Sequence, residues 1–183
     1  MEQDRKHYEA NVKAFLGRIK KRRSDIVKLV TQSISNLSPP DNITVTLSAF
    51  LEDHMVWIDA ESILKTLINL ETNAMEAMPD GGELFLGVEG DDHQVKITIR
   101  DTGTGISKEN MDMLFTQYFS TKPAGEGTGL SLPMAYAAVR EHGGKIGITS
   151  NDDPLREPTG TTVIITLPRA RPDLSNVILH GEE

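Results

Sequence analysis

The chain has 183 residues, 38% hydrophobic and 25% charged, which is typical of a soluble globular protein rather than a disordered or fibrous one. Its formal net charge of -8 argues against a general nucleic-acid binder, and the lack of cysteine excludes disulfides and thiolate metal sites. No apolar run approaches the roughly 20 residues of a membrane span, and the N-terminus lacks a signal-peptide core. We expect one domain of ordinary size with a short appendage.

A helical pattern covers the first 37 residues. Apolar residues from Val12 to Leu37 recur at steps of three and four, and the first prolines are Pro39 and Pro40. This predicts one long amphipathic helix that ends at Ser38 and pairs with a partner helix in a coiled coil or bundle. The basic run at 20–23 fits a nucleic-acid or membrane patch, but a solvated helix face is the favoured interpretation.

Strands and helices then alternate irregularly. Strands are expected at 43–47, 54–59, 83–88, 94–100, 146–149 and 161–167, with the third and fourth forming a hairpin. Helices are expected at 60–78 with Asp59 as N-cap, at 108–115, and at 130–141 with a stop at His142-Gly143-Gly144. The predicted fold is α+β: a two-layer sandwich whose mixed, mostly antiparallel sheet of about five strands has about three helices on one face, preceded by the long N-terminal helix.

Three segments could carry chemistry. Asn69, Asn73 and Glu76 fall on one face of the 60–78 helix, where amide oxygens suit a hard cation, although an ordinary polar face is an equal alternative. Asp101 ends a strand and precedes Gly103 and Gly105, a pattern that can hold an exocyclic amine beside a flat ring but is also common in surface turns.

The third segment, residues 122–132, contains Gly125, Gly127 and Gly129 just before a helix. Glycines that expose backbone N–H groups at a helix start can cradle phosphates, although a flexible loop is the alternative. The segment is neither a Walker A loop nor a dinucleotide fingerprint.

The order and spacing of these segments resemble the N, G1 and G2 boxes of the Bergerat-fold ATPases, the superfamily of gyrase, chaperones, histidine kinases and MutL. The run Phe119-Ser-Thr-Lys-Pro123 looks like the F box of histidine kinases, and the resemblance covers roughly residues 40–168. The N box that contains Asn69 and Asn73, together with the Phe119–Pro123 run, looks closest to the nitrogen-regulation-type sensor kinases. The resemblance implies the ATP-binding catalytic domain of a bacterial two-component sensor histidine kinase.

The resemblance also implies residue roles. Asn73 would coordinate Mg²⁺ with help from Asn69, Asp101 would bind the adenine amine, and Lys122 would contact phosphate. The nucleotide-site residues implied are Asn69, Asn73, Glu76, Ala77, Asp101, Gly103, Gly105, Ile106, Phe119, Thr121, Lys122, Gly125, Gly127, Thr128, Gly129, Leu130, Ser131 and Thr162. The segment 119–127 would be a mobile lid.

Two departures from the family pattern stand out. Ser131 replaces a usual glycine, which could weaken nucleotide binding or add a hydrogen bond, and Ala77 replaces an adenine-stacking aromatic. In the ATP-hydrolysing members that this sequence resembles, a glutamate that activates water precedes the metal-binding asparagine by four residues. Asn69 occupies that position here, and an amide cannot act as a base at neutral pH. Glu71 should point away from the site. Binding Mg·ATP without activating water suits transfer to a protein acceptor.

None of the five histidines has the context of a phosphoacceptor, and His7 is the nearest. We therefore expect the acceptor histidine on a dimerisation helix outside this chain, and no autophosphorylation by this chain alone. The expected division is 1–38 for the end of the dimerisation and phosphotransfer helix, 39–168 for the catalytic domain and 169–183 for a tail.

The expected cofactors are ATP and Mg²⁺, and the expected partners are the phosphoacceptor bundle and a response regulator, with no nucleic acid. A cytoplasmic location and a homodimeric parent follow from the same resemblance, whether or not that parent is membrane-bound. An ATP-hydrolysing relative and a non-catalytic nucleotide-sensing or docking module are the alternatives.

Overall fold

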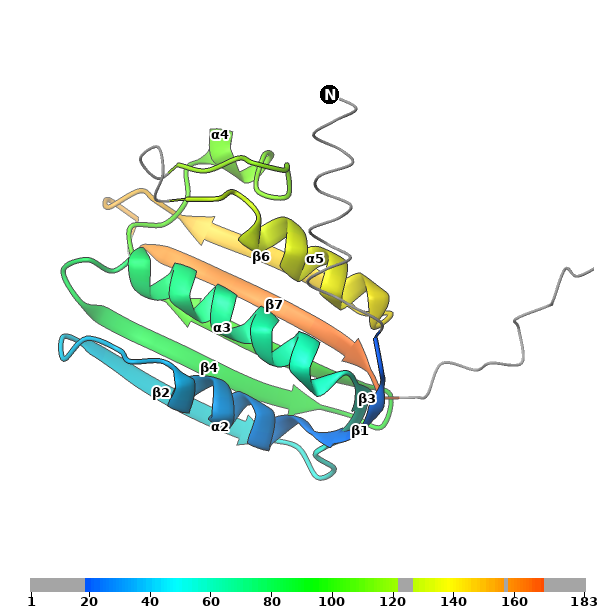
Figure 1. Cartoon of the computed structure of the whole chain (residues 1–183). Helices are drawn as coiled ribbons and strands as arrows, with labels where there is room; N and C mark the ends of the chain where they lie inside the picture. The colour runs from blue at the N-terminus through cyan, green and yellow to red at the C-terminus, as the bar shows by residue number, and fades with distance from the viewer. Residues whose placement is uncertain (1–18, 122–126, 157, 170–183) are drawn as a thin grey trace, which may run out of the picture.

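The computed structural model describes residues 19–121, 127–156 and 158–169. Within them, three helices lie side by side on one face of a five-stranded sheet (Figure 1). The strands are β2 (Ile43–Phe50), β4 (Gly82–Gly90), β5 (Gln94–Asp101), β6 (Lys145–Asn151) and β7 (Gly160–Pro168). The covering helices are α2 (Ile26–Asn36), α3 (Ala60–Glu76) and α5 (Ser131–Glu141).

The sheet has the order β2-β4-β5-β7-β6. The β2–β4 pair is parallel, and the other three pairs are antiparallel. The α+β sandwich with a mixed, mostly antiparallel sheet is therefore confirmed. The predicted helix at 108–115 is shorter, because α4 covers only Lys108–Met111.

The core lies between the sheet and the three helices. On β4, β5 and β7 every second side chain points at the helices, and these are almost all aliphatic, as the two-residue period of a half-buried strand requires. These residues are at most 8% exposed: Leu84, Leu86, Val88, Val95, Ile97, Ile99, Val163, Ile165 and Leu167. The central helix α3 adds Ile63, Leu67 and Leu70, so it is fixed on the sheet along its whole length.

The prediction of one long N-terminal helix is wrong for the residues that the structure describes. Residues Arg22–Asp25 form strand β1, which pairs antiparallel with β3 (Met55–Ile58) in a separate two-stranded sheet. Asp25 then starts α2 as an N-cap, because its side chain accepts a hydrogen bond from Lys28 N at 3.0 Å. The apolar periodicity thus ran across two different elements, strand β1 and helix α2. Residues 1–18 of the predicted helix lie outside the described residues.

The apolar stripe of α2 faces the core of this domain rather than the coiled coil or bundle that was predicted. Ile26, Leu29 and Val30 are at most 6% exposed and belong to the same core cluster as α3 and the sheet. Helix α2 ends at Asn36 with Leu37 as its C-cap, close to the predicted stop at Ser38 and before the two prolines.

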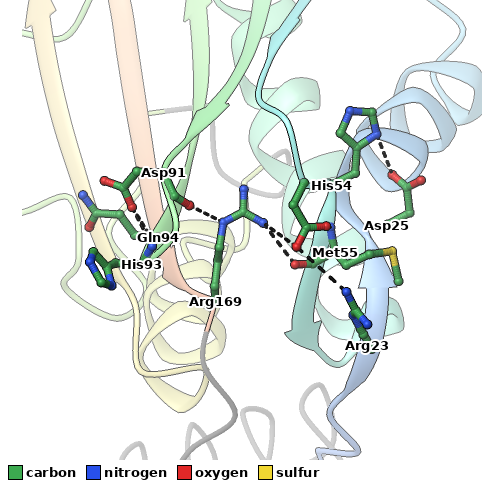
Figure 2. Close-up of polar contacts among 9 residues, drawn as sticks. Arg23, Asp25, His54, Met55, Asp91, His93, Gln94 and Arg169 are labelled. Carbon is green, nitrogen blue, oxygen red and sulfur yellow. Dashed lines mark hydrogen bonds and ion pairs between the residues drawn. The ribbon is translucent and has the colours of Figure 1, made fainter.

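The end of β7 is tied to the small sheet by Arg169, as Figure 2 shows. The side chain of Arg169 is 9% exposed, donates from Nη1 to Met55 O at 3.1 Å, and also donates to the carbonyl of Asp91 in the β4–β5 turn. Its Nη1 is 3.7 Å from Asp53 Oδ2, an oxygen that Arg23 of β1 approaches at 3.9 Å. Arg169, placed in the predicted tail, therefore makes structural contacts with the rest of the domain.

Candidate functional site

A cavity of about 480 Å³ opens between the C-terminal half of α3, the start of α5, the end of β5 and the start of β7. It brings together residues from all three chemistry-bearing segments of the sequence. The predicted residues that line it are Asn69, Asn73, Glu76, Ala77, Asp101, Gly105, Ile106, Phe119, Thr121, Gly127, Thr128, Gly129 and Ser131.

Helix α3 contributes the amide side of the cavity. Its N-cap is Asp59, as predicted, whose side chain accepts from Ser62 N at 3.1 Å. Asn69 and Asn73 are one turn apart and half-buried, and both line the cavity. Glu71 lies between them in sequence but is fully buried and is not among the lining residues, because the helical period turns it toward α2.

Asp101 is the buried carboxylate of the cavity, at the end of β5 and 6% exposed. Its Oδ1 accepts two backbone hydrogen bonds, from Gly103 N at 2.9 Å and from Thr161 N at 3.1 Å. Burial raises the pKa of this carboxyl above its ordinary value, and the two backbone donors oppose that rise. The two bonds hold the carboxylate in one orientation at the cavity.

Glycines shape the loop after Asp101. Gly105 has φ +73°, and a Cβ there would overlap the Asn151 carbonyl. The next residue, Ile106, donates from N to Ser150 Oγ at 2.8 Å, so the loop is held against β6. Gly103 does not line the cavity: it packs on Ala77 at the end of α3, whose carbonyl accepts from Thr104 N at 3.0 Å.

The loop before α5 forms the opposite wall. Gly129 has φ +62° and accepts from Tyr118 N at 3.1 Å, and a Cβ on it would overlap the Tyr118 backbone. Helix α5 begins at Ser131, and its N-cap Leu130 provides no side-chain cap. Ser131 and Leu132, the first two residues of α5, line the cavity, and the Leu130 side chain does not cap their backbone N–H groups.

Not every predicted residue is placed in the cavity. Lys122 and Gly125 lie outside the described residues, and Leu130 does not line the cavity. Thr162 does not line it either; its neighbour Thr161 does. Successive strand residues face opposite ways, and the alternating Thr161, Val163, Ile165 and Leu167 of β7 carried the signal that would have chosen Thr161.

Sequence reasoning also missed several other lining residues. They are Leu70, Thr72, Ala74, Ile99, Thr104, Leu114, Ser120, Leu132, Pro133, Ile148 and Val163. Most are aliphatic core residues whose position at the cavity depends on how the layers stack, which no local pattern reveals.

The described residues contain no group of three or more His, Asp or Glu side chains that could hold a metal ion. A hard cation in this cavity would have to be held by amide oxygens together with oxygens of its own ligand, for which Asn73 is suitably placed. None of the helices within the described ranges is long and apolar enough to span a bilayer.

Residues 58–171 match the family described as histidine kinase-, DNA gyrase B- and HSP90-like ATPase. Sporulation kinase E of Bacillus subtilis (strain 168) is 32% identical over 135 residues, covering 73% of this chain and 17% of that protein. Sensor histidine kinase ZraS of Escherichia coli (strain K12) is 36% identical over 110 residues, covering 60% of this chain and 22% of ZraS.

Solved structures agree with the sequence matches. The nucleotide-free catalytic domain of histidine kinase ThkA superposes with a TM-score of 0.71 at 27% identity, covering 82% of this chain and 96% of that one. The mycobacterial sensor histidine kinase MprB superposes with a TM-score of 0.70 at 24% identity and so supports the fold alone.

A two-layer α+β sandwich with this cavity defines a class of ATP-binding domain. The chain belongs to the histidine kinase-, DNA gyrase B- and HSP90-like ATPase family, as the ATP-binding catalytic domain of a two-component sensor histidine kinase. It spans about a fifth of the length of the two curated kinases named above.

Proposed function

We propose that this domain binds Mg·ATP in the cavity and donates the γ-phosphate to a histidine on a dimerisation helix. The observation that carries the proposal is that one cavity unites the amides of α3, the oriented carboxylate of Asp101 and the glycine-rich start of α5. These are the three kinds of group that a magnesium ion, an adenine amine and a phosphate chain require.

Each group has a distinct task. Asp101 would accept the adenine amine on Oδ2, because its Oδ1 already accepts from Gly103 and Thr161. The N–H groups at the start of α5 would bind phosphate oxygens, and Lys122 would be a further phosphate contact. Asn73, supported by Asn69, would hold Mg²⁺, and the chemistry supplied there by bound Mg²⁺ is neutralisation of phosphate charge.

Transfer to a protein is favoured over hydrolysis because the residues of α3 that would hold Mg²⁺ are amides rather than carboxylates. Neither Asn69 nor Asn73 can take a proton from water at neutral pH. Glu71 is fully buried away from the cavity, so it cannot reach a water molecule there. The domain's contribution would be positioning and electrostatic stabilisation of the transferred group.

The first experiment is calorimetry of ADP and ATP binding with and without Mg²⁺. We expect magnesium-dependent binding that weakens roughly 10- to 100-fold in Asp101→Asn, the loss of a hydrogen bond to a buried charged group. The matched control is Asp92→Asn, an exposed aspartate in the β4–β5 turn at the other end of β5, which should bind like the wild type. No binding by the folded wild type would support the docking-module alternative.

A second experiment tests phosphotransfer. The phosphoacceptor bundle of the parent kinase is supplied in trans with labelled ATP, and phosphohistidine is sought on each chain. We expect label on the bundle and none on this domain. Label on His7, which lies outside the described residues, would contradict the proposed position of the acceptor.

ATP hydrolysis is the second candidate, because Glu76 also lines the cavity. Steady phosphate release that is abolished by Asn73→Ala and reduced by Glu76→Gln would favour it. Release that persists in Asn73→Ala would indicate a contaminating activity instead.

The setting of the domain is also part of the proposal. We infer a homodimeric parent kinase, a response regulator as the receiver of the phosphate and a cytoplasmic location for this domain, supported by relatives named as sensor kinases. The Asn69–Met78 box and the 119–123 run support a resemblance to nitrogen-regulation-type kinases, although the two curated relatives described above carry other names.

We propose a revised domain boundary. Because β1 pairs with β3 and α2 packs in the core, the catalytic domain would begin near residue 19 rather than 39 and would include Arg169. Residues before it would belong to the dimerisation and phosphotransfer helix. A protein that starts at residue 19 should fold cooperatively, whereas one that starts at 39 should not.

A further inference from the structure

Strand β2 (Ile43–Phe50) forms one edge of the five-stranded sheet, and within the described chain no strand pairs with its outer side (Figure 1). It contains no charged residue and no proline, and its pairing with β4 runs without a bulge. Proteins usually protect a long sheet edge with lysine, proline or a bulge, because the free N–H and C=O groups pair readily with another strand. Strand β2 has none of these protections.

The opposite edge of the sheet, β6, is protected. It begins with Lys145, and its other end is covered by a loop. In that loop Ile106 N donates to Ser150 Oγ at 2.8 Å, and Gly105 lies so close to Asn151 O that a Cβ would overlap it. Among the residues that the structure describes, β2 is therefore the open edge of the sheet.

The direction of the backbone groups of β2 follows from one hydrogen bond. Asn42 O accepts from Gly82 N at 3.0 Å, so the backbone groups of Asn42 point toward β4. Successive residues of a strand direct these groups to opposite sides. Those of Val45, Leu47 and Ala49 therefore point away from β4, out of the edge of the sheet.

The side chains beside this edge are open on both faces of the sheet. Ile43 is 7% exposed and belongs to the core, so the odd-numbered residues of β2 face the helices. Leu47 on that face is nevertheless 37% exposed, and Phe50 on the other face is 87% exposed. A strand added at this edge would therefore cover apolar side chains as well as pair with backbone groups.

Acidic residues stand at both ends of the uncharged edge. Asp41 precedes β2 and Glu52 follows it, and both are exposed. The next acid, Asp53, is already approached by Arg23 and Arg169. A strand that lay along β2 in either direction would have an acidic group near each of its ends, which favours lysine or arginine there.

A second copy of the chain does not fit this edge. In a two-fold dimer, β2 would pair antiparallel with β2 of the other copy. Full overlap would place Thr46 opposite Leu47 and would bring Asp41 opposite Glu52 at both ends. Like charges opposite each other destabilise a strand pair, and each copy carries a net charge of -8.

We propose that β2 is a docking edge for an extended segment of a partner protein, which adds one more strand to the sheet. The segment has apolar and β-branched side chains in its middle and a lysine or arginine at each end. Backbone hydrogen bonds to Val45, Leu47 and Ala49 supply the affinity, and the charged ends select the partner. Docking at β2 is independent of the proposed nucleotide site, because no β2 residue lines the cavity.

The first test titrates the full chain with a synthetic peptide of about ten residues, in which valine and threonine alternate between two lysines at each end. Amide NMR should show shifts at Val45, Leu47 and Ala49, whose N–H groups should exchange more slowly with solvent. Exchange at Thr44 and Thr46, which face β4, should change little. No shift along β2 would overturn the proposal.

The same peptide with N-methyl groups on all its central residues is the matched control. It keeps the side chains and charges but lacks the backbone donors, so it should bind at least roughly tenfold more weakly. Equal binding of the two peptides would overturn strand addition.

Leu47→Pro tests the edge from the side of the protein. Proline removes the N–H that points out of the sheet, and edge strands tolerate it at such positions. Peptide binding should fall about tenfold, whereas Ser48→Ala, whose backbone groups face β4, should bind like the wild type. If Leu47→Pro does not fold, the N-methylated peptide decides the question on the wild type.

Charge reversal tests the choice of partner. Glu52→Lys should weaken binding of the lysine-ended peptide about fivefold at low salt and should strengthen binding of a glutamate-ended one. Glu109→Lys, on the exposed side of α4, is the matched control and should bind like the wild type. Tighter binding of the glutamate-ended peptide by the wild type would overturn the proposed chemistry of the partner.

The free chain shows whether something else covers the edge. The amides of Val45, Leu47 and Ala49 should exchange rapidly with solvent at every protein concentration. Protection at low concentration would mean that the chain's own residues cover β2. Protection that appears only on concentration, together with a dimer in sedimentation, would mean that a second copy pairs there. Either result would overturn the proposal.

Discussion

Helices α3 and α5 run between two ends of the domain that are built differently. At one end they line the cavity, where Gly105 and Gly129 adopt positive φ and the polar groups face open space. At the other end, the buried side chain of His142 bonds to backbone groups of both helices. Asp59 N donates to His142 Nε2 at 2.9 Å, and His142 Nδ1 lies 2.7 Å from Ala138 O.

These contacts define the protonation of His142 at the second end. Because Nε2 accepts from Asp59 N, the ring is neutral, with its hydrogen on Nδ1 for Ala138 O. Burial lowers the pKa of this histidine, which keeps it neutral. Asp59 Oδ2 also accepts from Lys20 N at 2.7 Å, so the start of the described chain is joined to both helices here.

The two ends of the domain therefore have different roles: one stabilises the fold and the other binds the ligand. Hydrogen bonds at the second end hold the N-terminal segment, α3, α5 and β7 together. At the cavity end, the side chains of Asn69, Asn73 and Asp101 line an open space that a ligand could fill. Changes at the second end should therefore lower stability with little effect on nucleotide affinity, and changes at the cavity end should do the reverse.

The largest effect is expected for His142→Ala. Removing a buried ring that bonds to two helices leaves a cavity and an unpaired Asp59 N–H, and should lower the free energy of unfolding by about 3 kcal/mol. Chemical denaturation measures the loss. The control His93→Ala, on an exposed side chain, should change it by less than about 0.5 kcal/mol. A large loss of nucleotide affinity with unchanged stability would contradict the division between the two ends.

Arg169→Ala should have the next largest effect, about 2 kcal/mol, because the carbonyls of Met55 and Asp91 lose a charged donor. Thermal unfolding is a sufficient measurement. Arg23→Ala is the matched control: it approaches the same Asp53 but its side chain is 63% exposed, so it should cost well under 1 kcal/mol. Equal losses in the two variants would mean that Arg169 contributes only through Asp53.

The second end was also the harder one to predict from the sequence. Helix and strand periods located the core of the sheet, and the capping preference of Asp59 and the glycine stop after His142 marked two helix ends correctly. The β1 strand was missed because the three- and four-residue apolar spacing continues across Asp25, and only pairing with β3 reveals the break. Arg169 was read as tail because its partners are distant in sequence.

The cavity end was more readable because its residues are close together in short motifs. Amides at helical spacing, a carboxylate at a strand end and glycines before a helix each have a local physical reason, and the cavity contains residues of all three. Thr162 was chosen where Thr161 lines the cavity, since a one-residue shift on a strand changes the face. The hydrogen bond between Ser33 of α2 and Glu71 of α3 had no local signal, because the two residues are 38 positions apart in the chain.

At the cavity end, Gly129→Ala should weaken nucleotide binding about tenfold, since strain at a positive φ costs about 1–3 kcal/mol and the loop must shift to accept a Cβ. Global stability should change less, because a loop can relax locally. Gly147→Ala is the matched control, since nothing lies within 4 Å of a Cβ added there. Calorimetry that finds wild-type affinity in Gly129→Ala would show that the loop geometry is not needed for binding.

The smallest effect is expected between the two ends, on the exposed face of α3. Lys65 Nζ lies 2.7 Å from Glu61 Oε1, one turn away, with side chains 49% and 78% exposed. Lys65→Ala should cost about 0.3 kcal/mol and leave nucleotide affinity unchanged, because water and salt screen the pair. The small loss should vanish in high salt, whereas that of His142→Ala should persist. If Lys65→Ala weakened nucleotide binding, perturbation anywhere along α3 would reach the cavity, and the two ends could not be regarded as separate.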